Sequence, residues 1–121
     1  MLLVDARAGL SEVHGIGLIA QEFIPKGTRI WTFQEGFDLV IPEDELSELS
    51  EPARDQVIWY AYYEKSTKEY ILSSDDDRFT NHSDTPNSTN IGEDTYAIVD
   101  IEPGVEITWD YLPHLKDEGE L

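Results

Sequence analysis

A dense run of hydrogen-bonding side chains occupies residues 78–87, which read Arg-Phe-Thr-Asn-His-Ser-Asp-Thr-Pro-Asn. His82 stands between Asn81 and Ser83, and a histidine beside a serine suggests hydrolase chemistry. In most catalytic triads, however, the base and the serine come from different backbone elements, since adjacent residues rarely face each other. The run is therefore a candidate site, but its pattern argues against a serine nucleophile.

Three successive aspartates, Asp75 to Asp77, precede this run and raise the alternative of a metal site. Together with His82 and Asp84 they would offer the oxygen-rich ligands that hard cations prefer. The spacing matches no established ligand motif. Successive acidic residues more often form a solvated loop or the first turn of a short helix, so no metal site is predicted.

Two glycines near the N-terminus form a second candidate, in the sequence Gly15-Ile16-Gly17. Paired glycines let a backbone approach a ligand closely or adopt positive φ. The full G-x-G-x-x-G pattern of dinucleotide sites is absent, and no βαβ unit follows. Taken alone, the pair favours a plain hairpin turn over a ligand site.

The third candidate is the segment Glu106 to Tyr111, near the end of the chain. Alternation along a strand would put Ile107, Trp109 and Tyr111 on one face. Taken alone, an aromatic pair at this spacing indicates a core face.

The elements that must position these residues are short strands separated by frequent turns. Strands are predicted over residues 2–5, 18–20, 28–33, 96–100 and 106–111, with a hairpin over 61–72 that turns at 65–68. Helices are predicted to begin at Pro42 and near Pro52, because proline suits the first turn of a helix. Residues 75–90 are expected to be irregular. The predicted fold class is β-rich α+β.

Composition limits the class of partner. The 121 residues fit a single domain, and 40% of them are hydrophobic, enough for a core. A net charge of −18 repels nucleic acid and anionic membranes and attracts Lys- and Arg-rich protein segments. Solubility or a high-salt habitat is an alternative reason for this charge. With no cysteine and no apolar run of about 18 residues, a soluble, intracellular protein is expected.

Taken in order, these segments resemble the SET domain family of protein-lysine methyltransferases. The Gly-x-Gly turn matches, and the Arg-Phe-x-Asn-His-Ser-x-x-Pro-Asn pattern matches at every specified position from 78 to 87. Residues 97–104 and 106–111 resemble the final strands of the family. The resemblance covers residues 11 to 112.

The resemblance implies a fold of several small sheets, one or two short helices and a C-terminal pseudoknot. The single domain would span residues 1–121, with a core over about 11–112 and an acidic tail over 113–121. It also implies S-adenosylmethionine as methyl donor and a basic protein, histone-like or otherwise Lys-rich, as substrate. By the family pattern the catalytic residue is Tyr111. The residues expected to bind the cofactor are Gly15, Ile16, Gly17, Arg78, Asn81 and His82.

Phe33 and Trp109 are expected to line the lysine channel, and both depart from the family pattern. Trp109 stands where the family usually has Tyr or Phe, and Phe33 lies near a place where many members have Tyr. Without cysteine, the zinc-binding regions that flank many members are missing. The short tail or a partner must then complete the channel, so a homodimer is one expectation.

Two other classes of function remain open at this stage. The first is a peptide-binding module that keeps the fold without turnover. The second is an acidic mimic that occupies a nucleic-acid-binding protein through charge alone. The retained Asn81, His82 and Tyr111 favour the enzyme.

Overall fold

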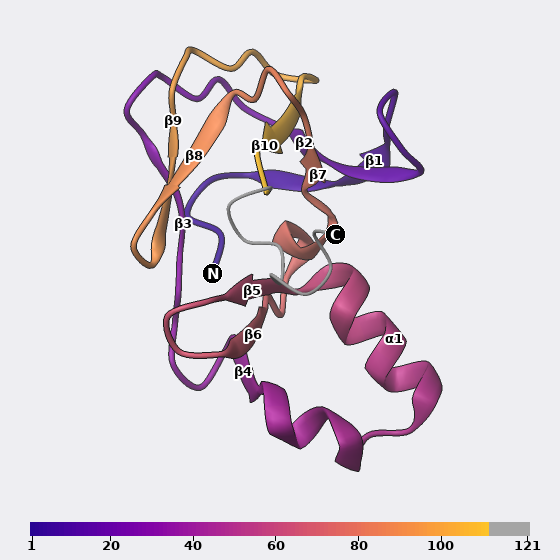
Figure 1. Ribbon diagram of the computed structural model, residues 1–121. Helices are drawn as coiled ribbons and strands as arrows, with labels where there is room; N and C mark the ends of the chain where they lie inside the picture. The colour runs from indigo at the N-terminus through magenta and orange to yellow at the C-terminus, as the bar shows by residue number, and fades with distance from the viewer. Residues whose placement is uncertain (112–121) are drawn as a thin grey trace.

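The computed structural model describes residues 1–111, which form three small antiparallel or mixed sheets, one α-helix and two short 3₁₀-helices (Figure 1). The four-stranded sheet has the order β1-β2-β10-β7, and its strands are β1 (Ala6–Leu10), β2 (Ile16–Ala20), β10 (Glu106–Trp109) and β7 (Asn81–His82). β10 pairs antiparallel with β2 and parallel with β7. This sheet therefore joins segments from both ends of the sequence.

The other two sheets have three strands each. One has the order β3-β9-β8 and consists of β3 (Arg29–Thr32), β9 (Asp94–Ala97) and β8 (Ser88–Ile91). The other has the order β4-β6-β5 and consists of β4 (Leu39–Pro42), β6 (Glu69–Leu72) and β5 (Tyr62–Glu64). Both contain a tight hairpin whose turn has a residue at positive φ, Gly92 (62°) and Lys68 (58°).

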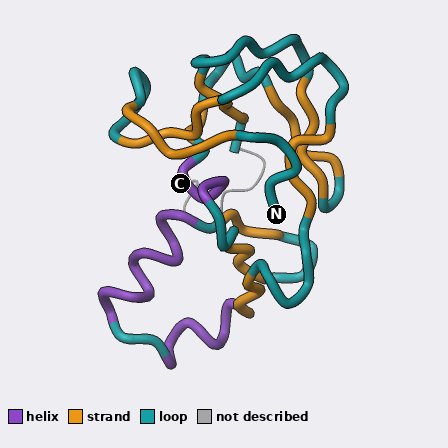
Figure 2. Tube along the Cα trace, turned by 180° about the vertical axis from the view of Figure 1, so that it is seen from behind, coloured by secondary structure: helices purple, strands orange, loops and turns teal. Residues whose placement is uncertain are grey.

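The helices begin where the local sequence supplies a start signal. In α1 (Glu51–Tyr60) the Ser50 hydroxyl accepts a hydrogen bond from the Ala53 amide at 3.3 Å, and Pro52 lies in the first turn. η1 (Glu43–Glu48) follows Pro42, and η2 (Asp76–Phe79) is capped by Asp75. Seen from either side, η1 and α1 lie at one end of the molecule beside the β4-β6-β5 sheet (Figures 1 and 2).

The main core lies among the three sheets. Its fully buried large side chains are Leu18, Ile24, Ile30, Trp31, Ile101 and Ile107. A smaller cluster packs α1 and η1 against the third sheet and consists of Leu46, Val57, Tyr63 and Tyr70. Burial of these side chains stabilises the fold by about 1.5–3 kcal/mol for each large one, which holds the short strands in place.

The predicted β-rich α+β class is confirmed, as are the helix near Pro52 and the hairpin within residues 61–72. The strand predicted over residues 2–5 is wrong. Only Leu2 forms a bridge there, with Trp31, and the first strand is β1. Residues 6–10 have little β propensity, but they pair along their whole length with the apolar β2, so tertiary pairing overrides local preference.

The strands predicted late in the chain are displaced. The strand expected over 96–100 begins and ends earlier, as β9 (Asp94–Ala97). Ile98 and Val99 lie past its end and are 38% and 48% exposed. β10 ends at Trp109, so the expected single face of Ile107, Trp109 and Tyr111 does not extend to Tyr111. The predicted acidic tail, residues 113–121, lies outside the described residues. No helix in the described part of the chain is long and apolar enough to cross a membrane.

Candidate active site

The candidate residues meet where β7 runs alongside β10. Thr108 is opposite Asn81 and Trp109 is opposite His82 in this parallel pairing. The Ser83 amide donates a hydrogen bond to the Trp109 carbonyl at 2.9 Å. Segments distant in sequence are therefore joined side by side, which is the contact that a C-terminal pseudoknot requires.

Asn87, in the loop before β8, hydrogen-bonds the backbone of β10 at the same junction. Its side-chain Nδ2 donates to the Glu106 carbonyl at 2.8 Å, and its Oδ1 accepts from the Thr108 amide at 2.8 Å. Ser88 adds a hydroxyl hydrogen bond to the Thr108 carbonyl at 2.7 Å. The side chains of residues 87 and 88 thus add hydrogen bonds to the backbone of β10 beyond those of its paired strands.

Asn81 connects the junction to the glycine turn through its side-chain amide. Nδ2 lies 3.0 Å from the His14 carbonyl, 3.1 Å from the Ile16 carbonyl and 3.1 Å from Ser11 Oγ. It also lies 2.9 Å from Glu106 Oε2. An amide group has two hydrogens, so these four acceptors share them. Asn81 therefore holds the turn against β10.

The two glycines of this turn have different roles. Gly15 adopts a φ of +52°, a conformation that favours glycine. Gly17 is already in β2, where an added Cβ would collide with Glu106 Oε2. Glu106 is itself fixed by Ser11, whose hydroxyl donates to Oε1 at 2.7 Å. Glycine is needed at position 17 because the carboxylate occupies the space of a side chain.

His82 and Tyr111 are held together on the other side of the junction. The Tyr111 amide donates to His82 Nδ1 at 3.3 Å, and the two rings pack edge-on with centroids 4.4 Å apart. His82 Nε2 lies 3.0 Å from Asp84 Oδ1. Asp110 Oδ1 lies 3.4 Å from Nδ1, so a carboxylate faces each nitrogen of the ring.

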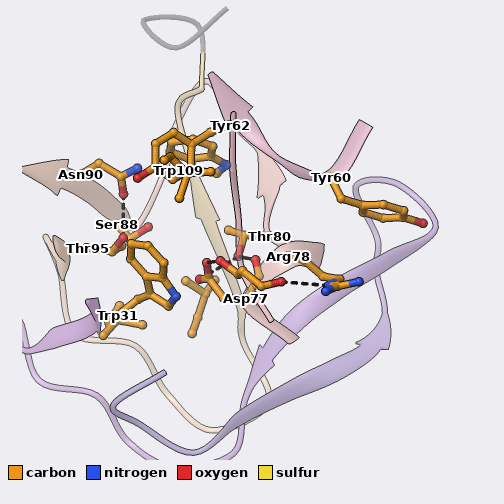
Figure 3. A pocket seen from close by; sticks show the side chains of 14 residues that line it. Trp31, Tyr60, Tyr62, Asp77, Arg78, Thr80, Ser88, Asn90, Thr95 and Trp109 are labelled. Atoms are coloured by element: carbon orange, nitrogen blue, oxygen red, sulfur yellow. Dashed lines mark hydrogen bonds between the residues drawn. The ribbon is translucent and has the colours of Figure 1, made fainter. Parts of the chain in front are cut away.

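A narrow cavity of about 40 Å³ lies beside this junction (Figure 3). Its aromatic walls include Trp31, Tyr60, Tyr62 and Trp109. The Tyr62 ring packs edge-on against Trp109 with centroids 5.9 Å apart, and against Trp31 at 6.4 Å. Burial raises the pKa of Tyr62, and nearby carboxylates add to the shift. The Tyr62 hydroxyl therefore stays protonated at physiological pH.

The cavity also has polar lining from the segment that carries η2. The Asp77 carboxylate accepts a hydrogen bond from Ser73 Oγ at 2.7 Å, whereas the Thr80 hydroxyl donates to the Asp77 carbonyl at 2.7 Å and lies 3.4 Å from the carboxylate. Burial raises the pKa of Asp77 to about 6. Arg78 lines the same cavity, and its Nε donates to the Ser73 carbonyl at 3.0 Å. Asp75 thus caps η2, and Asp77 lines the cavity. Within residues 1–111, no group of three or more His, Asp or Glu side chains is placed to hold a metal ion.

The profile of the SET domain family matches residues 15–112. This chain belongs to the SET domain family. Members of the family are typically protein-lysine methyltransferases that use S-adenosylmethionine. No curated protein matches the sequence.

Solved structures share the fold of this SET domain. An apo ctPRC2 with a doubly substituted Ezh2 superposes with a TM-score of 0.74 at 21% identity, covering 97% of this chain and 16% of that one. A humanised Chaetomium thermophilum Polycomb Repressive Complex 2 bound to an inhibitor superposes with a TM-score of 0.64 at 19% identity. That alignment covers 93% of this chain and 15% of the other. This SET domain therefore spans only about a sixth of those chains.

A candidate histone methyltransferase from Plasmodium falciparum is closer in size. Its crystal structure gives a TM-score of 0.61 at 22% identity, and the alignment covers 91% of this chain and 95% of that one. At these identities the likeness shows the fold alone. It places the three small sheets of this SET domain in a known arrangement.

The structure separates the two expected channel residues of this SET domain. Trp109 lies in the cavity wall, whereas Phe33 packs against the main core. The Phe33 amide donates a hydrogen bond to the Glu93 carbonyl at 3.0 Å. Tyr111 contacts the Trp109 ring, with centroids 6.3 Å apart, from outside the cavity lining. Tyr62 lines the cavity and was missed by sequence reasoning, although the aromatic run over residues 59–63 signals such a wall.

Proposed function

We propose that this SET domain transfers a methyl group from S-adenosylmethionine to the side-chain amine of a lysine in a basic protein. The observation that carries the proposal is the β7–β10 junction, which gathers Asn81, His82 and Tyr111 beside an aromatic cavity. The proposal treats residues 1–121 as one domain with its core over about 11–112.

The residues around the glycine turn suit the cofactor. The His14 and Ile16 carbonyls and the Glu106 carboxylate converge on Asn81 and form a set of acceptors. Such a set fits the ammonium group at the amino-acid end of S-adenosylmethionine. Arg78 supplies a cation for its carboxylate. Bound there, the cofactor supplies an electrophilic methyl group on a positively charged sulfur.

The cavity residues suit the acceptor amine. Free lysine has a pKa of about 10.4, so the amine arrives charged and must lose a proton before it can attack. The rings of Tyr62 and Trp109 attract the cation on entry, and their apolar walls then disfavour the ammonium form. Tyr111, which packs against His82 and against the Trp109 ring of the cavity wall, is proposed to align the neutral amine through its hydroxyl at the entrance to the cavity.

The proposal is tested with labelled cofactor. The purified protein is first titrated with S-adenosylmethionine by calorimetry and then incubated with histones and other basic proteins, with mass spectrometry of the products. Cofactor binding followed by lysine methylation supports the enzyme. Binding without transfer to any lysine would support the peptide-binding module, and absence of cofactor binding would refute the proposal.

Substrate affinity should fall as salt rises. The net charge of −18 creates an attractive field for a basic segment, and salt screens that field over about 10 Å at 0.1 M and 3 Å at 1 M. We expect the Kd for a Lys-rich peptide to rise by roughly ten-fold or more between low salt and 0.5 M. Fluorescence anisotropy of a labelled peptide measures this, and a salt-independent Kd would indicate apolar recognition.

Trp109 should limit the number of methyl groups added. Its indole lies in the cavity wall against Tyr62, where its bulk restricts the room for a methylated amine. We expect mono- and dimethyl-lysine from the unmodified protein, and a shift towards trimethyl-lysine in Trp109→Phe, provided the smaller ring leaves open space. Mass spectrometry of a peptide at full conversion measures the number of methyl groups added. Dominant trimethyl-lysine from the unmodified protein would disprove the limit set by Trp109.

A further inference from the structure

The cavity contains a carboxyl group that the proposed methyl transfer has not yet used. Asp77 lines the cavity from η2, and its carboxylate is directed inward, with a hydrogen bond from Ser73 and with the Thr80 hydroxyl 3.4 Å away (Figure 3). Neither hydroxyl neutralises its charge. A carboxylate inside an aromatic cavity is costly unless it is paired, so its presence there calls for a role.

Trp31 supplies a second polar group in the same cavity. Its side chain is 2% exposed, and its indole Nε1 has no hydrogen-bond partner among the residues that the structure describes. A buried indole N–H ordinarily finds an acceptor. The cavity volume of about 40 Å³ exceeds the 10–15 Å³ that one water needs. Donor and carboxylate thus border a space suited to an ordered water.

Tyr62 links this polar end of the cavity to the wall at Trp109. Its ring packs edge-on against both Trp31 and Trp109, and the negative charge of Asp77 is one of the causes that raise its pKa. The charge of Asp77 therefore acts on the region through which the acceptor amine is proposed to enter.

We propose that Asp77 accepts, through a water held by Trp31 Nε1, the proton that the substrate ammonium loses before methyl transfer. This inference rests on the proposed function. One N–H bond of the ammonium breaks and its proton passes to the water, which gives a proton to an Asp77 oxygen. The freed lone pair then forms the N–C bond while the methyl–sulfur bond of the cofactor breaks. Asp77 releases its proton to solvent between turnovers.

The surroundings of Asp77 suit this task. Burial is the largest influence and raises its pKa, the Asp75 carboxylate raises it further, and the Met1 amino group with the Ser73 and Thr80 hydroxyls lowers it. Arg78 and Tyr62 line the same cavity as Asp77. With a pKa of about 6, Asp77 is ionised at pH 7–8 and able to accept a proton. Below pH 6 it is already protonated.

This carboxylate also opposes folding at neutral pH, which fits a functional residue. The pKa of Asp77 is about 6 in the folded protein and about 3.9 in an unfolded chain. The folded state therefore binds this proton more tightly, and protonation stabilises the fold. Stability from this group is lost as pH rises from about 4 through 6. The melting temperature of Asp77→Asn should therefore exceed that of the unmodified protein at pH 8, with the difference closing below pH 4.

The decisive experiment is single-turnover methyl transfer to a Lys-rich peptide between pH 5 and pH 10, at saturating cofactor. The unmodified protein should lose activity below about pH 6. Asp77→Asn should be about 100-fold slower at pH 7, the lower end of general-base contributions, and should recover towards pH 10, where solvent deprotonates lysine. Trp31→Phe removes the N–H donor together with part of a buried ring system, and it should shift the profile in the same direction.

The matched control is Asp76→Asn on the same helix. Asp76 accepts a hydrogen bond from the Ala8 amide at 2.9 Å and lies outside the cavity lining, so its pH profile should match the unmodified protein. Asp77→Glu keeps a carboxylate and should retain the fall near pH 6 even if Asp77→Asn folds poorly. An unshifted profile in Asp77→Asn, or a loss that does not recover at high pH, would overturn the inference alone. Absence of transfer by the unmodified protein would overturn the proposed function and this inference with it.

Discussion

Replacing Tyr111 by Phe is expected to slow methyl transfer by about 10²–10³ while cofactor affinity stays within a few-fold. The Tyr111 ring packs against His82 and Trp109, and its backbone amide bonds His82. Phe keeps all of these contacts, so only the hydroxyl is lost. Because the hydroxyl is assigned to alignment of the amine, the loss should appear in the rate of the chemical step.

Single-turnover kinetics and calorimetry separate these two quantities. Tyr96→Phe is a matched control, because it also removes a hydroxyl with a hydrogen bond, to Asp94 at 3.3 Å, on β9 and away from the cavity. It should leave the rate unchanged. Equal rates in Tyr111→Phe and the unmodified protein would remove Tyr111 from the mechanism, whereas a large loss of cofactor affinity would give it a binding role instead.

The helices and the hairpin of the third sheet were predictable because their signals are local. Ser50 and Pro52 start α1, and the Lys65–Lys68 turn lies between two β-rich segments. The three-sheet arrangement is different, since it depends on strands as short as β7 that have no periodicity of their own. That part of the fold followed only from the family resemblance.

Sequence motifs predicted which residues are candidates for the site, but not the contacts among them. Sequence motifs indicated Asn81 and Tyr111, while the role of Glu106 appears only once β10 is beside the glycine turn. Asp77 looked like one of three solvated acids, yet η2 turns it inward while Asp75 caps the helix. Which of three identical neighbours faces a cavity depends on tertiary packing.

Asn81→Ala is the substitution expected to damage cofactor binding most. The Asn81 amide holds the His14 and Ile16 carbonyls at 3.0 and 3.1 Å and Glu106 Oε2 at 2.9 Å. Ala removes these bonds and leaves the partly buried Glu106 carboxylate with Ser11 as its remaining side-chain hydrogen-bond donor. A net loss of about 1 kcal/mol for each neutral bond, and more for the bond to a charged group, predicts destabilisation of about 2–4 kcal/mol.

The loss of affinity should exceed what instability alone produces, because Asn81 orients the carbonyls that are proposed to meet the cofactor. We expect the Kd for S-adenosylmethionine to rise by about 100-fold, roughly 2.7 kcal/mol, and the cofactor-induced rise in melting temperature to shrink accordingly. Asn90→Ala is the matched control for cofactor affinity, since its amide oxygen accepts from Thr95 at 2.7 Å in the cavity wall and makes no contact with the glycine turn or Glu106 among the described hydrogen bonds. It should cost about 1 kcal/mol of stability and leave the Kd unchanged. A cofactor-induced shift of equal size in Asn81→Ala and the unmodified protein would show that the Asn81 amide organises the fold without organising the cofactor site.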